Sequence, residues 1–159
     1  MGCFLIAWRN GMTTSPNPQD DGLKLVKRHE WIFKGKTFGI LVSCRGLDGD
    51  TNDKWTWCMY ALIYDNHPLF KDAEAAIEQL PWHCGCTYEE RFFQEPARGI
   101  RYEWQRKGEW LKIGCDYAHL YDDHYQRMSP EGGIPPAIQA DAQELFSALL
   151  ARQESSHDS

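Results

Sequence analysis

The chain has no long hydrophobic run and no surplus of basic residues. Its 159 residues include 17 Lys and Arg against 23 Asp and Glu, which gives a net charge of -6. An acidic chain lacks the cations that general binding to nucleic acid or to an anionic membrane requires. Residues 1–9 have no basic leader, and their apolar run is too short for a signal peptide or a membrane span. We therefore expect a soluble, cytoplasmic protein without a membrane partner.

Several common catalytic motifs are missing as well. The sequence contains no Gly-rich phosphate-binding loop, no dinucleotide-binding fingerprint and no serine-hydrolase elbow. Its six cysteines are too sparse for a disulfide scaffold, and we expect reduced thiols. Cys44 and Cys58 lie in apolar stretches and are predicted to be buried in the core.

The pattern of apolar residues predicts a single α+β domain, with an antiparallel or mixed sheet of five or six strands and two packed helices. Strands are expected over residues 29–45 (with a break at Gly35), 55–64, 89–95, 100–104 and 109–115. Residues 55–64 are almost continuously apolar, which is typical of a central strand covered on both faces. Helices are expected over residues 71–80 and 137–151. The domain would span residues 23–152, between a flexible leader (1–22) and a frayed tail (153–159).

Two short polar segments, residues 82–88 and 114–124, concentrate the side chains that carry out chemistry. Together they hold three of the six cysteines, three of the six histidines and three aspartates. Both lie at expected element boundaries, where side chains can project from a rigid scaffold. A shared site requires that the two segments meet in space.

A site made of histidine and aspartate is the first interpretation of these segments, with His83, Asp116 and His119 as catalytic residues. His119 and Asp122 are three residues apart and would share one face of a helical turn. Together with Asp116 they would offer nitrogen and oxygen ligands to a divalent metal, Zn, Mg or Mn. Without a metal, one histidine would act as a general base that an aspartate orients.

Three neighbouring side chains would bind the ligand in this interpretation. The hydroxyls of Thr87 and Tyr88 would hold a phosphate or a sugar, and the ring of Tyr117 would stack on a base or a sugar. The ligand expected is therefore phosphate-containing or nucleotide-like.

Three other interpretations stay open. A zinc site would use Cys84, Cys86, Cys115 and His119, although Cys-x-Cys is closer than the usual spacing of structural zinc ligands. Alternatively, one of these cysteines would be a nucleophile beside a histidine. In the last interpretation, the polar residues only cap turns and satisfy buried backbone groups.

Part of the sequence resembles an uncharacterised family common in phages and prophages. The resemblance lies within residues 55–150 and rests on three motifs: His67-Pro68-Leu69, His83-x-Gly85-x-Thr87-Tyr88 and Gly114-x-Asp116-x-x-His119-x-x-Asp122. The chain departs from the family pattern at its cysteines and one tyrosine, namely Cys84, Cys86, Cys115 and Tyr117. The resemblance implies an origin in a phage or mobile element, hence a host bacterial cytoplasm, and favours the histidine–aspartate site over the zinc site. It implies no particular activity.

Two functional classes follow, and the sequence leaves open whether the protein is an enzyme. In the first, the histidine–aspartate site binds, and hydrolyses, a phosphate-containing ligand. In the second, the protein is a non-catalytic counter-defence protein or inhibitor, which blocks a host protein or sequesters a ligand. A structural zinc-binding interaction module is a further alternative.

Overall fold

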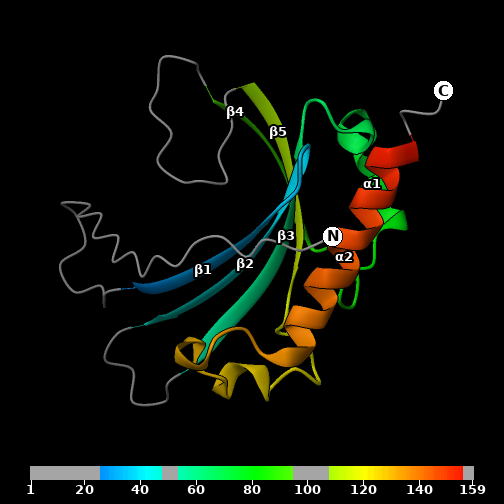
Figure 1. Cartoon of the computed structure of the whole chain (residues 1–159). Coiled ribbons are helices and arrows are strands. Elements are labelled where there is room, and N and C mark those ends of the chain that lie inside the picture. Colours follow the sequence, from blue (N-terminus) through cyan, green and yellow to red (C-terminus); the bar gives the residue numbers. More distant parts are fainter. Residues whose placement is uncertain (1–25, 48–53, 95–107, 156–159) are drawn as a thin grey trace.

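The computed structural model describes residues 26–47, 54–94 and 108–155. They form one antiparallel sheet and two helices, so the expected α+β class is confirmed (Figure 1). The strands are β1 (Val26–Lys34), β2 (Phe38–Leu47), β3 (Trp55–Tyr64), β4 (Tyr88–Gln94) and β5 (Gly108–Asp116). Their order in the sheet is β1-β2-β3-β5-β4, which places β5 between β3 and β4.

The break expected at Gly35 is the turn of the β1–β2 hairpin. Lys34 pairs with Gly39 at its closed end, and the amide of Gly35 donates to the carbonyl of Phe38 at 2.8 Å. A Cβ atom on Gly35 would lie 2.6 Å from the ring of Phe38, so only glycine leaves room for that ring. The close packing of the Phe38 ring thus explains why the residue at this turn is glycine.

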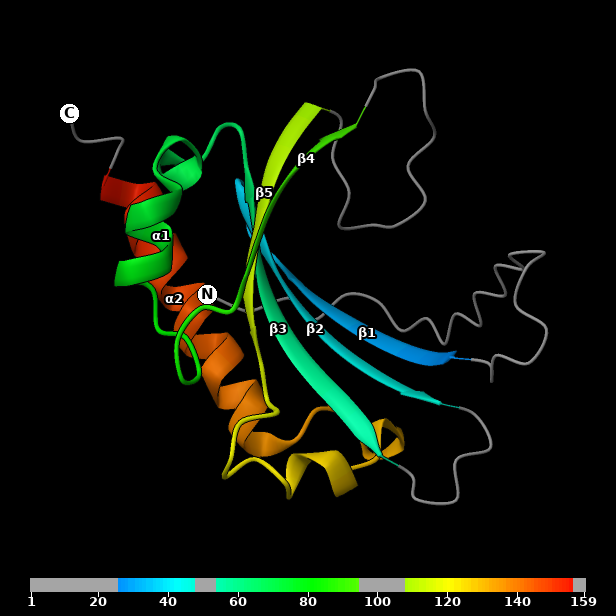
Figure 2. The same cartoon turned by 180° about the vertical axis from the view of Figure 1, so that it is seen from behind.

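Both helices lie on the same face of the sheet (Figure 2). Side chains between the two layers form the main core, to which β3 contributes Trp57, Met59 and Ile63. On the other face, Leu62 and Tyr64 join a second buried cluster. Because successive residues of a strand point to opposite faces, β3 is covered on both sides, as its apolar sequence predicts.

The first helix is shorter than expected. A 3-10 turn, η1 (Pro68–Lys71), precedes α1 (Ala73–Gln79), and the carboxylate of Asp72 caps α1 by accepting from the amide of Ala75 at 2.9 Å. Pro81 follows after Leu80, which prevents continuation of the helix.

The second helix is longer than expected, because α2 spans Pro136–Ser155. Its buried stripe consists of Ile138, Ala142, Leu145 and Leu149. Residues 153–155, which the sequence places in a frayed tail, belong to this helix, and Gln153 accepts a hydrogen bond of 2.7 Å from the hydroxyl of Thr37. A contact with the turn between β1 and β2 therefore accompanies the extension of the helix beyond its apolar stripe.

Some expectations fall outside the described residues, including the leader (1–22) and the strand over residues 100–104. The buried positions expected for Cys44 and Cys58 are confirmed, with exposed fractions of 0% and 6%. Among the described residues, no helix is both long and apolar enough to cross a membrane.

Candidate functional site

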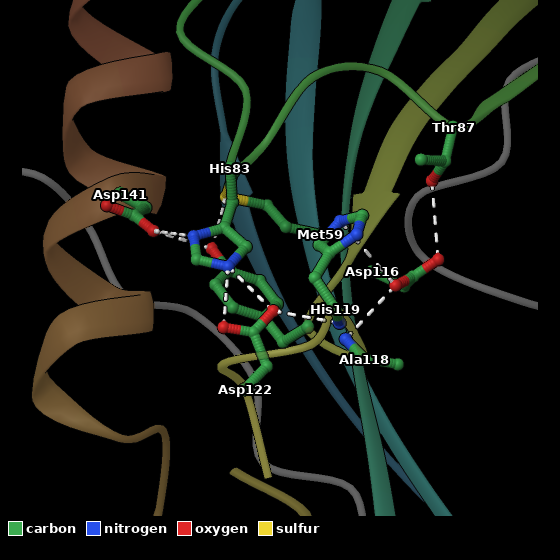
Figure 3. A network of polar contacts seen from close by, with 9 residues as sticks. Met59, His83, Thr87, Asp116, Ala118, His119, Asp122 and Asp141 are labelled. Carbon is green, nitrogen blue, oxygen red and sulfur yellow. Dashed lines mark hydrogen bonds and ion pairs between the residues drawn. The ribbon is translucent and has the colours of Figure 1, made fainter. Parts of the chain in front are cut away.

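The two polar segments meet beside α2, so the assumption on which a shared site depends is confirmed (Figure 3). Residues 80–87 join α1 to β4, and residues 117–124 follow the end of β5. The carboxyl end of β5 and the entry to β4 are neighbours because these strands pair, with Tyr88 opposite Gly114. Strand pairing therefore brings together residues separated by more than thirty positions in the chain.

His83 lies at the centre of the polar network. Its Nε2 donates to both oxygens of Asp122, at 3.0 and 2.9 Å. Its ring stacks on Tyr117, with centroids 4.3 Å apart. On the opposite side of the ring, Nδ1 lies 3.8 Å from Oδ2 of Asp141, which is longer than a hydrogen bond. The imidazole is therefore held on one nitrogen and has no hydrogen-bonded partner among the described residues on the other.

Asp122 is the buried anchor of this arrangement. Its side chain is 6% exposed, and its Oδ2 also accepts from the backbone amide of His119 at 3.1 Å. The same carboxylate therefore orients the His83 ring and fixes the turn at residues 119–122, which a backbone hydrogen bond of 2.9 Å also closes.

Tyr117 lies beneath His83 and is 1% exposed. Its hydroxyl donates to Oδ2 of Asp141 at 2.8 Å. Burial, followed by the hydrogen bond to Asp141, raises the pKa of Tyr117 well above its usual range. In this structure the predicted ligand-binding ring of Tyr117 supports the imidazole and orients Asp141.

His119 lies beside His83, with ring centroids 5.9 Å apart. Its Nε2 is buried and has no hydrogen bond, and Oδ1 of Asp116 is 3.9 Å away. The Asp116 carboxylate itself accepts from the amide of Ala118 at 3.1 Å and from the hydroxyl of Thr87 at 3.4 Å. Most buried polar atoms are paired, so a buried imidazole nitrogen without a hydrogen bond is unusual and marks His119 as a residue to test.

Tyr88, the remaining predicted ligand-binding residue, is directed elsewhere. Its ring packs edge-on against Tyr60 at 5.3 Å, and its hydroxyl donates to Glu90. Burial, followed by the hydrogen bond to Glu90, raises its pKa to about 12. The structure thus places the hydroxyl of Thr87 on Asp116 and turns the hydroxyl of Tyr88 toward Glu90.

The predicted metal ligands are not arranged as a metal site in the described part of the chain. There, no group of three or more His, Cys, Asp or Glu side chains is placed to hold a metal ion. The thiol of Cys115 is 1% exposed, and burial raises its pKa to about 12. The metal set (His119, Asp122 and Asp116) and the zinc set that includes Cys115 both stay predictions.

Asp141 is the member of the network that the sequence does not reveal, because its sequence position is that of an ordinary acidic residue near the start of a helix. It lies three residues after Ile138 and four before Leu145, both fully buried. That spacing places Asp141 at the border of the apolar stripe of α2. An acidic residue at such a border is a signal that could have identified it.

The fold and the site together define a two-layer α+β protein, in which one imidazole lies between two carboxylates at the end of the sheet. No protein-family model, no curated protein and no solved structure matches the chain. The resemblance to a phage family therefore stays a prediction.

Proposed function

We propose that His83 and His119 form a binding site for a phosphate-containing or nucleotide-like ligand, in an accessory protein of a phage or mobile element. In this proposal, His83 is a general base that activates water at the bound ligand. The observation that carries the proposal is that each of these two neighbouring histidines has a ring nitrogen without a hydrogen bond among the described residues.

The orientation of His83 supports the role of general base. Because Nε2 donates its proton to Asp122, the neutral ring carries its lone pair on Nδ1. A buried carboxylate that fixes the tautomer of a histidine is a recurring arrangement in acid–base catalysis. Asp122 is thus the positioning residue, and His83 is the group that would exchange a proton.

The surrounding charges set a condition on ligand binding. Asp116, Asp122 and Asp141 place three carboxylates around the two imidazoles. Like charges repel, so these carboxylates weaken the binding of an anionic phosphate. We therefore expect affinity for phosphate compounds to rise when the charge of Asp141 is removed.

Calorimetric titration with inorganic phosphate and with nucleoside mono- and triphosphates tests this proposal. The variants His83→Ala and His119→Ala should bind about 10- to 100-fold more weakly, which is the effect of losing a hydrogen bond to a charged group. Asp141→Asn should bind more tightly, because it removes a negative charge 3.8 Å from Nδ1 but keeps an acceptor for Tyr117. Release of phosphate, measured in parallel, should fall about 10²- to 10⁴-fold in His83→Ala.

His124→Ala is the matched control, because His124 is exposed and its ring contacts only Tyr125 among the described rings. Each variant is first compared with the wild type in thermal unfolding, so that a folding defect is not mistaken for a binding defect. Affinity that is equal in wild type and His83→Ala, or that does not rise in Asp141→Asn, would contradict the proposal.

A second candidate function is supported by two exposed apolar side chains beside the site. Leu120 and Tyr121 are 82% and 87% exposed, although Asp122 anchors the turn that carries them. A fixed turn that presents apolar groups is typical of a protein-binding surface. This observation favours the counter-defence or inhibitor alternative.

One comparison separates the two candidate functions. The full-length protein, a Leu120→Ser/Tyr121→Ser double variant and His119→Ala are each cross-linked in a bacterial lysate. A blocking protein should lose its partner in the double variant and keep it in His119→Ala. A ligand-binding enzyme should show the reverse pattern in calorimetry. Its affinity for the phosphate ligand should be kept in the double variant and reduced in His119→Ala.

A further inference from the structure

Two cysteines flank Gly85 in the turn that follows His83. The amide of Gly85 donates to the carbonyl of Trp82 at 3.4 Å, which closes the turn. Cys84 is exposed, whereas Cys86 is half-buried and donates to the carbonyl of Tyr88 at 3.3 Å. The chain therefore offers one accessible thiol and a second thiol two residues away.

The backbone at Cys84 is unusual. Its φ is 55°, and no other non-glycine residue in the described ranges has a positive φ. A side chain other than glycine is disfavoured in this left-handed region. The turn accommodates this residue on the surface, where the thiol makes no hydrogen bond to a described residue.

The other three described cysteines are buried and cannot react with a reagent in solution. Cys44, Cys58 and Cys115 are 0%, 6% and 1% exposed. Burial raises the pKa of Cys44 and Cys115 to about 12 and also raises that of Cys58. Since the thiolate is the reactive form and needs access, these three thiols are inert in the folded protein.

We propose that Cys84 and Cys86 are a redox pair that forms an intramolecular disulfide by exchange with a low-molecular-weight disulfide such as oxidised glutathione. The thiolate of Cys84 attacks one sulfur of the disulfide, and one thiolate leaves as a mixed disulfide forms on Cys84. The thiolate of Cys86 then attacks Cys84 and releases the second thiol. The two cysteines lose two electrons and two protons, and the small disulfide is reduced to two thiols.

The geometry of the turn suits ring closure. A disulfide needs Cα atoms about 4.4–6.8 Å apart, and two residues of extended chain span about 7 Å. Gly85 is not extended, since its φ is 97°, and this bend brings the two Cα atoms closer than the extended limit. Nothing lies within 4 Å of the position of its Cβ, so the linking residue has room to change conformation.

Thiol exchange on the full-length protein tests the pair directly, and independently of any ligand at His83. The reduced protein is incubated with oxidised glutathione, free thiols are alkylated, and the peptides are mapped by mass spectrometry. We expect a Cys84–Cys86 disulfide in the wild type and a persistent glutathione adduct on Cys84 in Cys86→Ser. In Cys84→Ser the exchange should be at least ~10-fold slower, because the accessible thiol is gone.

Cys115→Ser is the matched control, since it removes a buried thiol close to the turn and should leave the disulfide unchanged. Three results would overturn the proposal: a stable glutathione adduct on wild-type Cys84, a disulfide between Cys86 and Cys115, or no reaction in the native protein. Alkylation of Cys44 in the same sample reports any unfolded fraction, because that thiol is inaccessible in the fold.

Discussion

Gly114 shows how one missing side chain determines the packing on the face of the sheet opposite the helices. A Cβ atom there would overlap the ring of Tyr60 and would lie 2.6 Å from the carbonyl oxygen of Met59. Because Gly114 has no side chain, the Tyr60 ring lies against β5, where Nζ of Lys112 is 4.1 Å from its centroid. Cation–π contacts of this kind add to the burial of the ring.

We expect Gly114→Ala to lower the free energy of unfolding by about 1–3 kcal/mol, the usual cost of overpacking. The backbone oxygen of Met59 is fixed by strand pairing and cannot move aside. Urea denaturation of the wild type, Gly114→Ala and Gly132→Ala measures the effect. Gly132 is the control because nothing lies within 4 Å of its Cβ position. Equal loss in the two variants would refute the steric explanation.

The identity of the site residues could be predicted from their chemistry, but their roles could not. His83, Asp116, His119 and Asp122 were selected because of their side-chain types and their density in two segments, and the structure brings them together. Whether Tyr117 faces a ligand or supports His83 depends on burial, to which helix α2 contributes Asp141. A contact between residues 24 positions apart has no local sequence signature.

At the scale of elements, His67 joins η1 to α2. Its Nδ1 accepts from the amide of Leu69 at 3.1 Å, so Nε2 carries the proton and donates to the carbonyl of Leu149 at 3.2 Å. The residue is 3% exposed, and burial lowers its pKa below the ordinary value of 6.5 despite the opposing hydrogen bond to Leu149. A protonated ring would place a donor at Nδ1 against the amide of Leu69.

This arrangement predicts that acid weakens the fold. Because the folded pKa lies below 6.5, the unfolded chain takes up the proton first. The contribution of His67 is therefore complete above pH 6.5, declines as the pH falls toward the folded pKa, and then levels off. Urea midpoints across this range should fall in the wild type and change less in His67→Asn, which keeps an acceptor for Leu69. His124→Asn, at an exposed site, should retain the dependence of the wild type; if His67→Asn does so too, another group is responsible.

Element boundaries could be predicted where local signals mark them. Gly35 ends β1, and Pro81 follows α1, as expected from their backbone preferences. The prediction for residues 153–155 is wrong because their polar sequence suggests fraying, whereas Gln153 bonds to Thr37 in the distant turn between β1 and β2. Tertiary contacts of this type override local propensity.

At the scale of the whole molecule, the antiparallel α+β class could be predicted from apolar periodicity, but the order of the strands could not. The expected strands at 55–64 and 109–115 are separated by the segment that contains β4, yet β5 pairs directly with β3. Pairing between distant segments depends on the complete core and not on local sequence. The same pairing assembles the polar site at the end of β5.

Because α2 packs on the sheet through one shared core, we expect the helix and the sheet to unfold together in one transition. Leu145 is 0% exposed and belongs to the main core between the layers. We expect Leu145→Ala to cost about 2–5 kcal/mol in the free energy of unfolding, with a single transition. Calorimetry of this variant and of Glu144→Ala, its exposed neighbour, provides the comparison. Separate melting of helix and sheet signals would show that the layers do not unfold together.

The two outer strands of the described sheet have a consequence for behaviour at high concentration. β1 carries Arg28, Glu30 and Lys34, and β4 carries Glu89, Glu90 and Arg91. A strand from another molecule could add only beside these charges, and charged outer strands are a common defence against such addition. Charge at both margins thereby opposes edge-to-edge polymerisation of concentrated protein.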